Sequence, residues 1–451
     1  STEPEAAVRG DALHVPRLVM PFGARSATGL DLPFSEVERL LGSHTADAIG
    51  ALDLDALTQG YELLEELCQQ YVREATASLD AASVPAWHHK LLFGWCAAQS
   101  HVARRGVTAA DVLAAHPSMQ AEVGCAEVVG PRFAEALSGA VPYQELLFPG
   151  GSMEVLRPVY EDGALAAFYN RCVVAALRSI LRVLPSGPRV SVLEVGAGTG
   201  GTASSVLPVL DGSCARYVFT DVSSAFLRQA EKRFGGFRFV EYALLNIDAD
   251  PRLQGFALHQ FDVIGATNVL HATPFVRRTL HNCARLLRPG GLLVANELMV
   301  PAAFLQMTFG LTDGWWLYAE SDDPERRGNP DPNMSWEQWD RLLRATGFRH
   351  RHCMGGDRFL RGQGVLVAQT TPQVTAAPPS APSGLQLLSR GIGGLAPLPA
   401  RPLVPGGARR LPTVSPPRRA AHRRAGAAAA QAAHVPLLLG AAPGHALLVQ
   451  P

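Results

Sequence analysis

Two residues, His271 and Glu297, have the types and the placement that acid–base chemistry requires. His271 follows the apolar stretch FDVIGAT (261–267), and Glu297 ends the apolar stretch GLLVANE (291–297). If these stretches are neighbouring strands, their ends lie about 5 Å apart and the two side chains can form a hydrogen bond. An imidazole titrates near neutral pH, and a carboxylate beside it fixes its tautomer, so the pair can act as a general base. Two structural roles stay open, because a lone histidine after a strand also serves as a hydrogen-bonding group and Glu297 could cap a helix.

A glycine-rich stretch, EVGAGTGGT (194–202), predicts a ligand-binding turn between a strand and a helix. Glycines in such a turn let the backbone approach a ligand closely and point N–H groups at it. The stretch satisfies two patterns. Gly196, Gly198 and Gly201 fit the dinucleotide pattern G-x-G-x-x-G, whereas Gly196, Gly198 and Gly200 fit the E/D-x-G-x-G-x-G loop of methyl-transfer enzymes. The turn alone therefore leaves the cofactor open.

Two acidic residues stand beside this turn. Glu194 lies two residues before the first glycine, where a carboxylate disfavours a pyrophosphate and suits a ligand with a cationic amino-acid end. Asp221 ends the next predicted strand, where a carboxylate can accept hydrogen bonds from both ribose hydroxyls. Asp221 indicates a ribose in either class of cofactor.

From Arg189 onward, short apolar strands alternate with helical spacers, and this rhythm predicts a parallel sheet with helices on both faces. The predicted strands are 189–195, 216–222, 237–244, 261–267 and 291–297, with a last strand at 362–369. A late helix, MSWEQWDRLLRATGF, begins with Ser335 and Gln338 in capping-box spacing and ends at Gly347.

The rest of the chain divides into three further segments. Residues 1–150 contain helical patterns and predict a helical subdomain, and residues 151–184 include a long helix, 164–184, that leads into the sheet domain at 185–370. Residues 371–451 hold eight Arg, 14 Pro and no Asp, Glu or Lys, which favours a disordered tail or linker over a packed domain.

The segment downstream of the glycine turn decides between the cofactors. FDVIGATNVLHAT, ARLLRPGG with its R-P-G-G turn, and LLVANE resemble the corresponding motifs of class I S-adenosylmethionine (SAM) methyltransferases. More narrowly, LEVGAGTGGT, YVFTDVSSAFLRQAEKRF, DADPRLQGF, NVLHAT and FGLTDGWW resemble the C-methyltransferase domains of modular polyketide synthases, in the same order over roughly 150–370.

This resemblance implies an α/β fold, a Rossmann-like class I core with a seven-stranded, mostly parallel sheet in the order 3-2-1-4-5-7-6 and an N-terminal helical lid. It implies SAM as cofactor and, as partners, neighbouring synthase domains and an acyl carrier protein whose phosphopantetheine arm holds the polyketide intermediate. The family most often methylates the α-carbon of a β-ketoacyl thioester, and a sister group methylates a β-oxygen. A non-catalytic methyltransferase-like module is a third reading, which the intact acidic and histidine positions disfavour.

Within this resemblance His271 is the base, and Glu297 orients it and stabilises the imidazolium. The residues expected to bind SAM are Glu194, Gly196, Gly198, Gly200, Asp221, Asn246, Asn268 and Tyr160. Asn246 is the departure from the family, because LNIDAD stands where the family has Leu-Asp-Ile; its carbonyl can still accept from adenine, and Asp248 is the alternative. Trp315 and Trp316 either pack in the core or line the acyl pocket, and Asn170 either contacts the cofactor or packs.

Composition excludes several other classes of protein. The chain has 451 residues with 40 basic and 40 acidic side chains, so no global field favours a nucleic acid or an anionic membrane surface. Its seven cysteines form no C-x-x-C pair, and no Cys/His spacing predicts a metal site. Reduced cysteines, a polar N-terminus unlike a signal peptide, and the lack of a run of about 18 apolar residues together predict a cytoplasmic protein without a membrane span.

Overall fold

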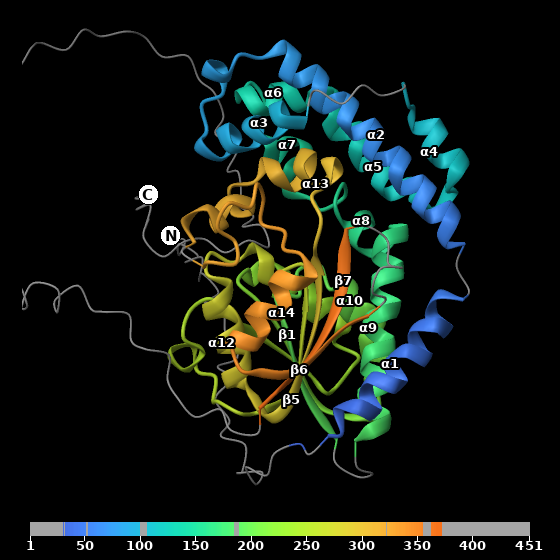
Figure 1. Cartoon of the computed structure of the whole chain (residues 1–451), viewed down its shortest axis with the longest axis vertical. Coiled ribbons are helices and arrows are strands. Elements are labelled where there is room, and N and C mark those ends of the chain that lie inside the picture. Colours follow the sequence, from blue (N-terminus) through green and yellow to red (C-terminus); the bar gives the residue numbers. More distant parts are fainter. Residues whose placement is uncertain are drawn as a thin grey trace, which may run out of the picture. The chain divides into compact units, whose positions relative to one another are not determined.

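A computed structural model describes residues 30, 32–50, 53–99, 106–184, 189–321, 323–354 and 362–371. Its centre is one seven-stranded sheet with the strand order β3-β2-β1-β4-β5-β7-β6 (Figure 1). The strands are β1 (Val190–Val195), β2 (Cys214–Asp221), β3 (Val240–Leu244), β4 (Phe261–Thr267), β5 (Leu287–Leu298), β6 (Phe348–Met354) and β7 (Gln363–Thr370). Strands β1 to β5 pair in parallel, and β7 runs antiparallel between β5 and β6. The predicted fold class and strand order are confirmed.

Fourteen α-helices lie within the described residues, besides eight short 3-10 segments. They are α1 (Phe34–Ile49), α2 (Leu54–Ser78), α3 (Trp87–Gln99), α4 (Ala109–Ala115), α5 (Gln120–Val129), α6 (Phe133–Ser138), α7 (Tyr143–Leu147), α8 (Arg157–Glu161), α9 (Ala164–Val183), α10 (Gly201–Leu210), α11 (Ser224–Phe234), α12 (Val276–Leu286), α13 (Ala303–Thr308) and α14 (Trp336–Ala345). The helix predicted at 164–184 is confirmed by α9, and the predicted capping box of α14 forms between Ser335 and Gln338.

Two apolar clusters cover the two faces of the sheet, because successive side chains of a strand point to opposite faces. In β1, Val190 and Val192 belong to the cluster beneath α9, α10 and α11, whereas Leu193 and Val195 belong to the cluster beneath α12 and α14. Figure 1 shows α9 on one side of the sheet and α12 and α14 on the other. This two-sided burial explains why the central strands β1, β4 and β7 are largely apolar, whereas the edge strand β6, FRHRHCM, is mostly polar and partly exposed.

The N-terminal helices fall into two groups by what they contact. Helix α1 packs on α9 and β6, and so belongs with the sheet, although it lies within the predicted helical segment 1–150. Helices α2 to α7 pack on one another, and α2 and α5 also contact α13, which follows β5. We call α2–α7 the lid. The predicted domain boundaries stay a prediction.

Helix α9 passes the length and composition test for a membrane span. The segment Arg157–Val183 is the one that does so among the described residues, and 61% of its most apolar window is buried inside the protein. Because α9 packs on α1, α10, β5 and β7, its apolar residues are accounted for as core. This is the helix that the sequence predicted at 164–184.

One local prediction is wrong. The RPGG stretch, expected to be a turn before the strand, is the irregular first part of β5, which begins at Leu287. The register with β4 shifts there, Gly290 has φ +78°, and the Leu30 N–H donates to the Pro289 carbonyl over 2.8 Å. The predictions for the N-terminal decapeptide and for most of 371–451 lie outside the described residues.

Candidate active site

The glycine turn joins the end of β1 to the first residue of α10. Gly196, Gly198 and Gly200 have φ values of +60°, +55° and +80°, a region that side chains with a Cβ disfavour. Space is also restricted, because a Cβ on Gly196 would lie 2.6 Å from Cγ2 of Val269. The glycines thus hold a tight turn at the carboxyl end of the sheet, where open parallel sheets bind ligands.

His271 and Glu297 form a hydrogen-bonded pair beside this turn. His271 lies in the single 3-10 turn Leu270–Ala272 after β4, and its Nδ1 is 2.5 Å from Oε2 of Glu297 at the end of β5. The two side chains are 2% and 0% exposed. The predicted side-chain contact between neighbouring strand ends therefore exists in the fold.

The Glu297 carboxylate also fixes the backbone that carries His271. It accepts N–H groups from Val269, Leu270 and His271 over 3.3, 2.8 and 3.3 Å. With four donors around it and no exposure to water, this carboxylate is held as an acceptor toward Nδ1. That contact assigns the ring proton to Nδ1 and leaves Nε2 as the acceptor, since a neutral imidazole has one of each.

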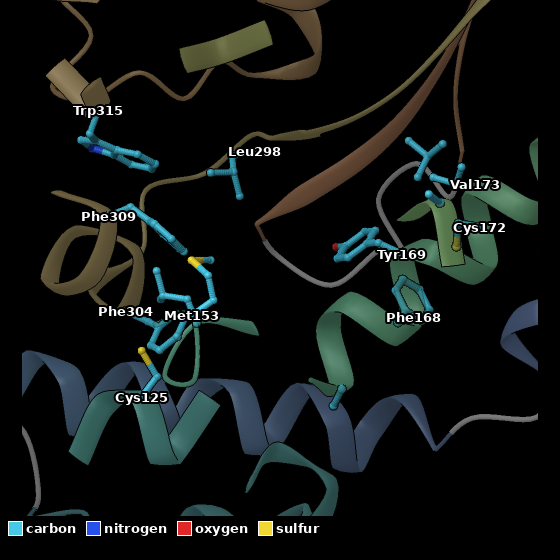
Figure 2. Packing of buried hydrophobic residues seen from close by; sticks show 14 of the residues in the cluster. Cys125, Met153, Phe168, Tyr169, Cys172, Val173, Leu298, Phe304, Phe309 and Trp315 are labelled. Atoms are coloured by element: carbon cyan, nitrogen blue, oxygen red, sulfur yellow. The ribbon is translucent and has the colours of Figure 1, made fainter. Parts of the chain in front are cut away.

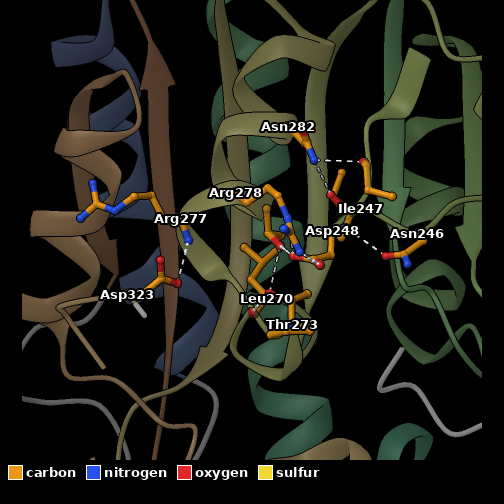
Figure 3. A network of polar contacts seen from close by, with 12 residues as sticks. Asn246, Ile247, Asp248, Leu270, Thr273, Arg277, Arg278, Asn282 and Asp323 are labelled. Atoms are coloured by element: carbon orange, nitrogen blue, oxygen red, sulfur yellow. Dashed lines mark hydrogen bonds and ion pairs between the residues drawn. The ribbon is translucent and has the colours of Figure 1, made fainter. Parts of the chain in front are cut away.

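A second set of polar contacts supports the His271 turn from behind. The buried guanidinium of Arg326 donates to the carbonyls of His271 and Thr273 over 2.9 Å each. Burial lowers the pKa of Arg326 to about 10, which still leaves it charged at neutral pH. Figure 3 shows the neighbouring network, in which Thr273 donates to the Leu270 carbonyl over 2.8 Å. The His271 side chain is thus carried on a turn that several hydrogen bonds hold in place.

A cavity runs from the glycine turn past His271 to the lid. Tyr61 and Glu122 line it from the lid, and Tyr160 lines it from α8. Its far wall is apolar and includes Leu298, Phe304, Phe309 and Trp315, which Figure 2 shows grouped on one side. The Trp315 ring stands edge-on to His271, with centroids 5.7 Å apart. An apolar pocket with one convergent acid–base pair is the usual form of a small-molecule site.

The chain resembles known proteins over the part that builds this cavity. Residues 193–293 match the family described as a methyltransferase domain. Polyketide synthase ThaG of Burkholderia thailandensis is 39% identical over 250 residues, which are 54% of this chain and 4% of that protein. Polyketide synthase PksR of Bacillus subtilis is 32% identical over 260 residues, which are 56% of this chain and 10% of that protein.

Solved structures of carbon methyltransferases are also similar to this chain. The CurJ carbon methyltransferase is 28% identical with a TM-score of 0.68, over 75% of this chain and 100% of that one. The CMeT domain of the citrinin polyketide synthase is 25% identical with a TM-score of 0.65, over 76% and 100%. The chain contains a methyltransferase domain, and that domain is similar to those of polyketide synthases. The trans-methyltransferase CalH, solved with SAH, is 26% identical with a TM-score of 0.55, over 70% and 92%.

Within the methyltransferase domain, both acids beside the glycine turn are buried. The Asp221 carboxylate accepts N–H groups from Gly198 and Ser223 over 3.0 and 2.8 Å, and burial raises its pKa to about 6. Glu194 is 4% exposed and accepts the Tyr217 hydroxyl over 2.7 Å, and burial raises its pKa to about 8. Asp221 therefore shapes the turn directly. The predicted contacts of both acids with the cofactor stay predictions.

Asn246 is the residue predicted to contact the adenine of the cofactor. Its side-chain oxygen accepts the Asp248 N–H over 3.0 Å and retains a second lone pair. The alternative, Asp248, is turned away: its carboxylate pairs with Arg278, as Figure 3 shows. The adenine contact stays a prediction for either residue, and neither is among the residues that line the cavity.

Asn268 and Tyr160 both line the cavity, as expected of residues near the cofactor. Asn268 has the left-handed φ of +53°, and its side-chain oxygen accepts from Gln363 over 2.7 Å, so β7 helps to hold the turn after β4. The Tyr160 carbonyl approaches Gly201, where a Cβ would lie 2.7 Å away. Helix α8 therefore packs directly on the start of α10.

Trp315, Trp316 and Asn170 differ in what they contact. Trp315 lines the cavity, whereas Trp316 is 1% exposed and donates to the Gly310 carbonyl over 2.8 Å, as a core residue would. Asn170 lines the cavity and accepts from the Thr202 hydroxyl over 2.9 Å.

Sequence reasoning missed several polar residues of the cavity, among them Glu122 and Asn296. Glu122 of the lid is 1% exposed, and one of its oxygens accepts the Leu165 N–H over 3.3 Å. Asn296, at the end of β5, is 2% exposed. The only signal for Asn296 is a polar residue directly before Glu297 in an otherwise apolar strand, and Glu122 has no signal in its helical pattern.

Proposed function

We propose that the chain transfers a methyl group from SAM to the α-carbon of a β-ketoacyl chain held on the phosphopantetheine arm of an acyl carrier protein. The observation that carries this proposal is the His271–Glu297 pair, with its 2.5 Å contact, at the wall of a cavity that also borders the glycine turn. The names of the similar structures, two of them carbon methyltransferases or CMeT domains, support carbon as the acceptor atom.

His271 is the base in this proposal. The α-proton of a β-keto thioester is unusually acidic, so a neutral imidazole is a competent acceptor. Nε2 takes the proton, the C–H electron pair moves into the forming enolate, and Glu297 stabilises the imidazolium through Nδ1–H. After transfer the proton leaves the imidazolium to water, which returns the pair to its starting state.

The glycine turn and its neighbours would hold the cofactor. Gly196, Gly198 and Gly200 would let the backbone approach it, Asp221 would accept from the ribose, and Asn246 would meet the adenine. Glu194, Asn268 and Tyr160 complete the proposed contacts. When bound, SAM supplies an electrophilic methyl group, so the protein's tasks are deprotonation and positioning.

The acyl chain would lie along the apolar wall formed by Leu298, Phe304, Phe309 and Trp315. The described residues that line the cavity include no Lys or Arg, which suits a neutral thioester. The carrier protein and the neighbouring synthase domains are proposed partners, supported by the polyketide synthases among the relatives.

Intact-mass measurement on a panel of acyl carrier proteins tests the proposal. With SAM present, a β-ketoacyl carrier should gain the mass of one methyl substitution, and the matched β-hydroxyacyl carrier should gain none. No gain on the keto carrier, with SAM binding demonstrated by calorimetry, would refute the transfer, and gain on the hydroxy carrier alone would point to O-methylation.

A further inference from the structure

Asn296 is a buried polar residue in the wall of the cavity. It is the penultimate polar residue of β5, directly before Glu297, and its register partner on β4 is Thr267. Its backbone carbonyl accepts the Asn268 N–H over 2.7 Å, and its side chain lines the cavity. Asn296 is therefore fixed by the same strand ends that carry the acid–base pair.

The Asn296 amide is buried without a partner. The residue is 2% exposed, and no described residue forms a hydrogen bond with its side chain; Oδ1 is fully buried. The other asparagines of the cavity are paired, Asn170 with Thr202 and Asn268 with Gln363. The buried oxygen is closed to a ligand, so the group that can meet one is Nδ2, which has no partner among the described residues and belongs to a residue of the cavity wall.

The position of β5 indicates which ligand this is. The glycine turn follows β1, and β4 lies between β1 and β5, so the ends of β1 and β5 are about 10 Å apart. A ligand held on the glycine turn approaches β4 first, and Asn296 lies beyond it, on the side of Leu298 and the apolar wall. This is where the acceptor, not the cofactor, would lie.

The negative charge that forms during deprotonation needs a hydrogen-bond donor, and the Asn296 amide can supply one. Removing the α-proton places negative charge on the carbonyl oxygen, and the lining residues that the structure describes offer no Lys or Arg to neutralise it. Neutral donors that are already buried and fixed can stabilise such an oxyanion strongly. Nδ2 of Asn296 has two N–H groups, and none of the described residues accepts from them.

We infer that Nδ2 of Asn296 donates a hydrogen bond to the carbonyl oxygen of the acyl chain and stabilises the enolate that forms when Nε2 of His271 takes the α-proton. This inference rests on the proposed function. The C–H bond breaks as the N–H bond of His271 forms, and the electron pair is delocalised onto the oxygen that Asn296 contacts.

Exchange of the α-proton tests the inference without methyl transfer. The full chain, saturated with SAH, is mixed in D₂O with the 3-oxobutanoyl thioester of N-acetylcysteamine, and deuterium uptake above the uncatalysed background is followed by NMR. Asn296→Ala should lower the enzyme-dependent rate about 100-fold, the cost typical of losing one oxyanion donor. Asn296→Asp should be slower still at pH 8, because an ionised carboxylate would repel the enolate.

The matched control is Asn333→Ala. Asn333 is 4% exposed and also has a buried unpartnered Oδ1, but it does not line the cavity, and its Nδ2 donates to the Val300 carbonyl over 3.2 Å. This variant should exchange within twofold of wild type. The SAH affinity of Asn296→Ala should also stay within twofold. Asn296→Leu, which keeps the branching of the side chain but has no donor, should repeat the loss if the alanine variant is unstable.

Two results would count against these assignments in different ways. Exchange by Asn296→Ala within threefold of wild type overturns the role of Asn296 and leaves the base untouched. Wild-type exchange no faster than background, with SAH bound, overturns the proposed function and the inference together.

Discussion

Glu297→Gln is the substitution that most sharply separates positioning of the base from its mere presence. The carboxylate has four donors: the backbone N–H groups of Val269, Leu270 and His271, and the ring Nδ1 at 2.5 Å. Glutamine keeps one acceptor oxygen but puts an NH₂ group in the place of the other. If the oxygen stays with Leu270, the NH₂ group faces two donors at His271.

The least costly response is a change of tautomer. Nδ1 then accepts from the new NH₂ group and Nε2 carries the proton, so the nitrogen facing the cavity is no longer a base. The equivalent carboxylate-to-amide change in a serine protease triad lowers turnover by about 10⁴, and we expect a loss of about 10³–10⁴ here. The unpaired His271 N–H should also cost about 1–3 kcal/mol of unfolding free energy.

Single-turnover methyl transfer to a β-ketoacyl carrier protein measures the first effect, and calorimetry with SAH measures cofactor affinity, which should stay within twofold. Glu241→Gln is the control, because Glu241 pairs with Arg216 over 2.9 Å at the edge of the sheet, away from the cavity. Transfer by Glu297→Gln within threefold of wild type would refute the orienting role.

Three further predictions address the base, the turn and the buried acid. His271→Ala should abolish methyl transfer and leave SAH affinity nearly unchanged; a transfer rate within tenfold of wild type would show that another group takes the proton. Gly200→Ala should lower both the unfolding midpoint and the SAH affinity, since φ is +80° and the new Cβ would lie 2.6 Å from Phe234. The control Gly212→Ala has a similar φ of +78° but no atom within 4 Å of the new Cβ, so it should lower the midpoint only slightly. Equal effects of the two substitutions would rule out the clash with Phe234. Burial raises the pKa of Glu194 from 4.5 to about 8, so the native state keeps a proton that the unfolded chain releases. The free energy of unfolding should therefore fall as pH rises from about 4.5 to 8. Thermal melts of Glu194→Gln should lack this decline, and a pH profile identical to that of wild type would contradict the pKa shift.

The sheet domain was predictable because its signals are local and repeated. Each apolar strand is buried on both faces, so it reads as an apolar run, and the alternation with helices selects a parallel sheet. The pairing of His271 with Glu297 followed from one further step, the adjacency of their strands. The RPGG stretch was predicted to be a turn before the strand because its glycines favour a bend. Gly290 does bend the chain there, but the stretch remains part of β5, with a shift in register against β4.

The cavity was less predictable because its polar residues are brought together by packing between segments that lie far apart in the sequence. Glu122 reaches the cavity only because α5 of the lid packs on α8, and Asn296 is informative only because its amide lacks a partner. Neither fact leaves a periodic trace in the sequence. Asp248 illustrates the converse, since its spacing allowed an adenine contact and only its ion pair with Arg278 argues against one.

The position of the transferred methyl group tests the proposed chemistry most directly. SAM carrying a ¹³C-methyl group and a β-ketoacyl carrier protein labelled with ¹³C at the α-carbon are incubated with the full chain, and the product is examined by NMR. Deprotonation by His271 at the α-carbon predicts a methyl signal split by one-bond coupling to the labelled carbon. An uncoupled methoxy signal would contradict it.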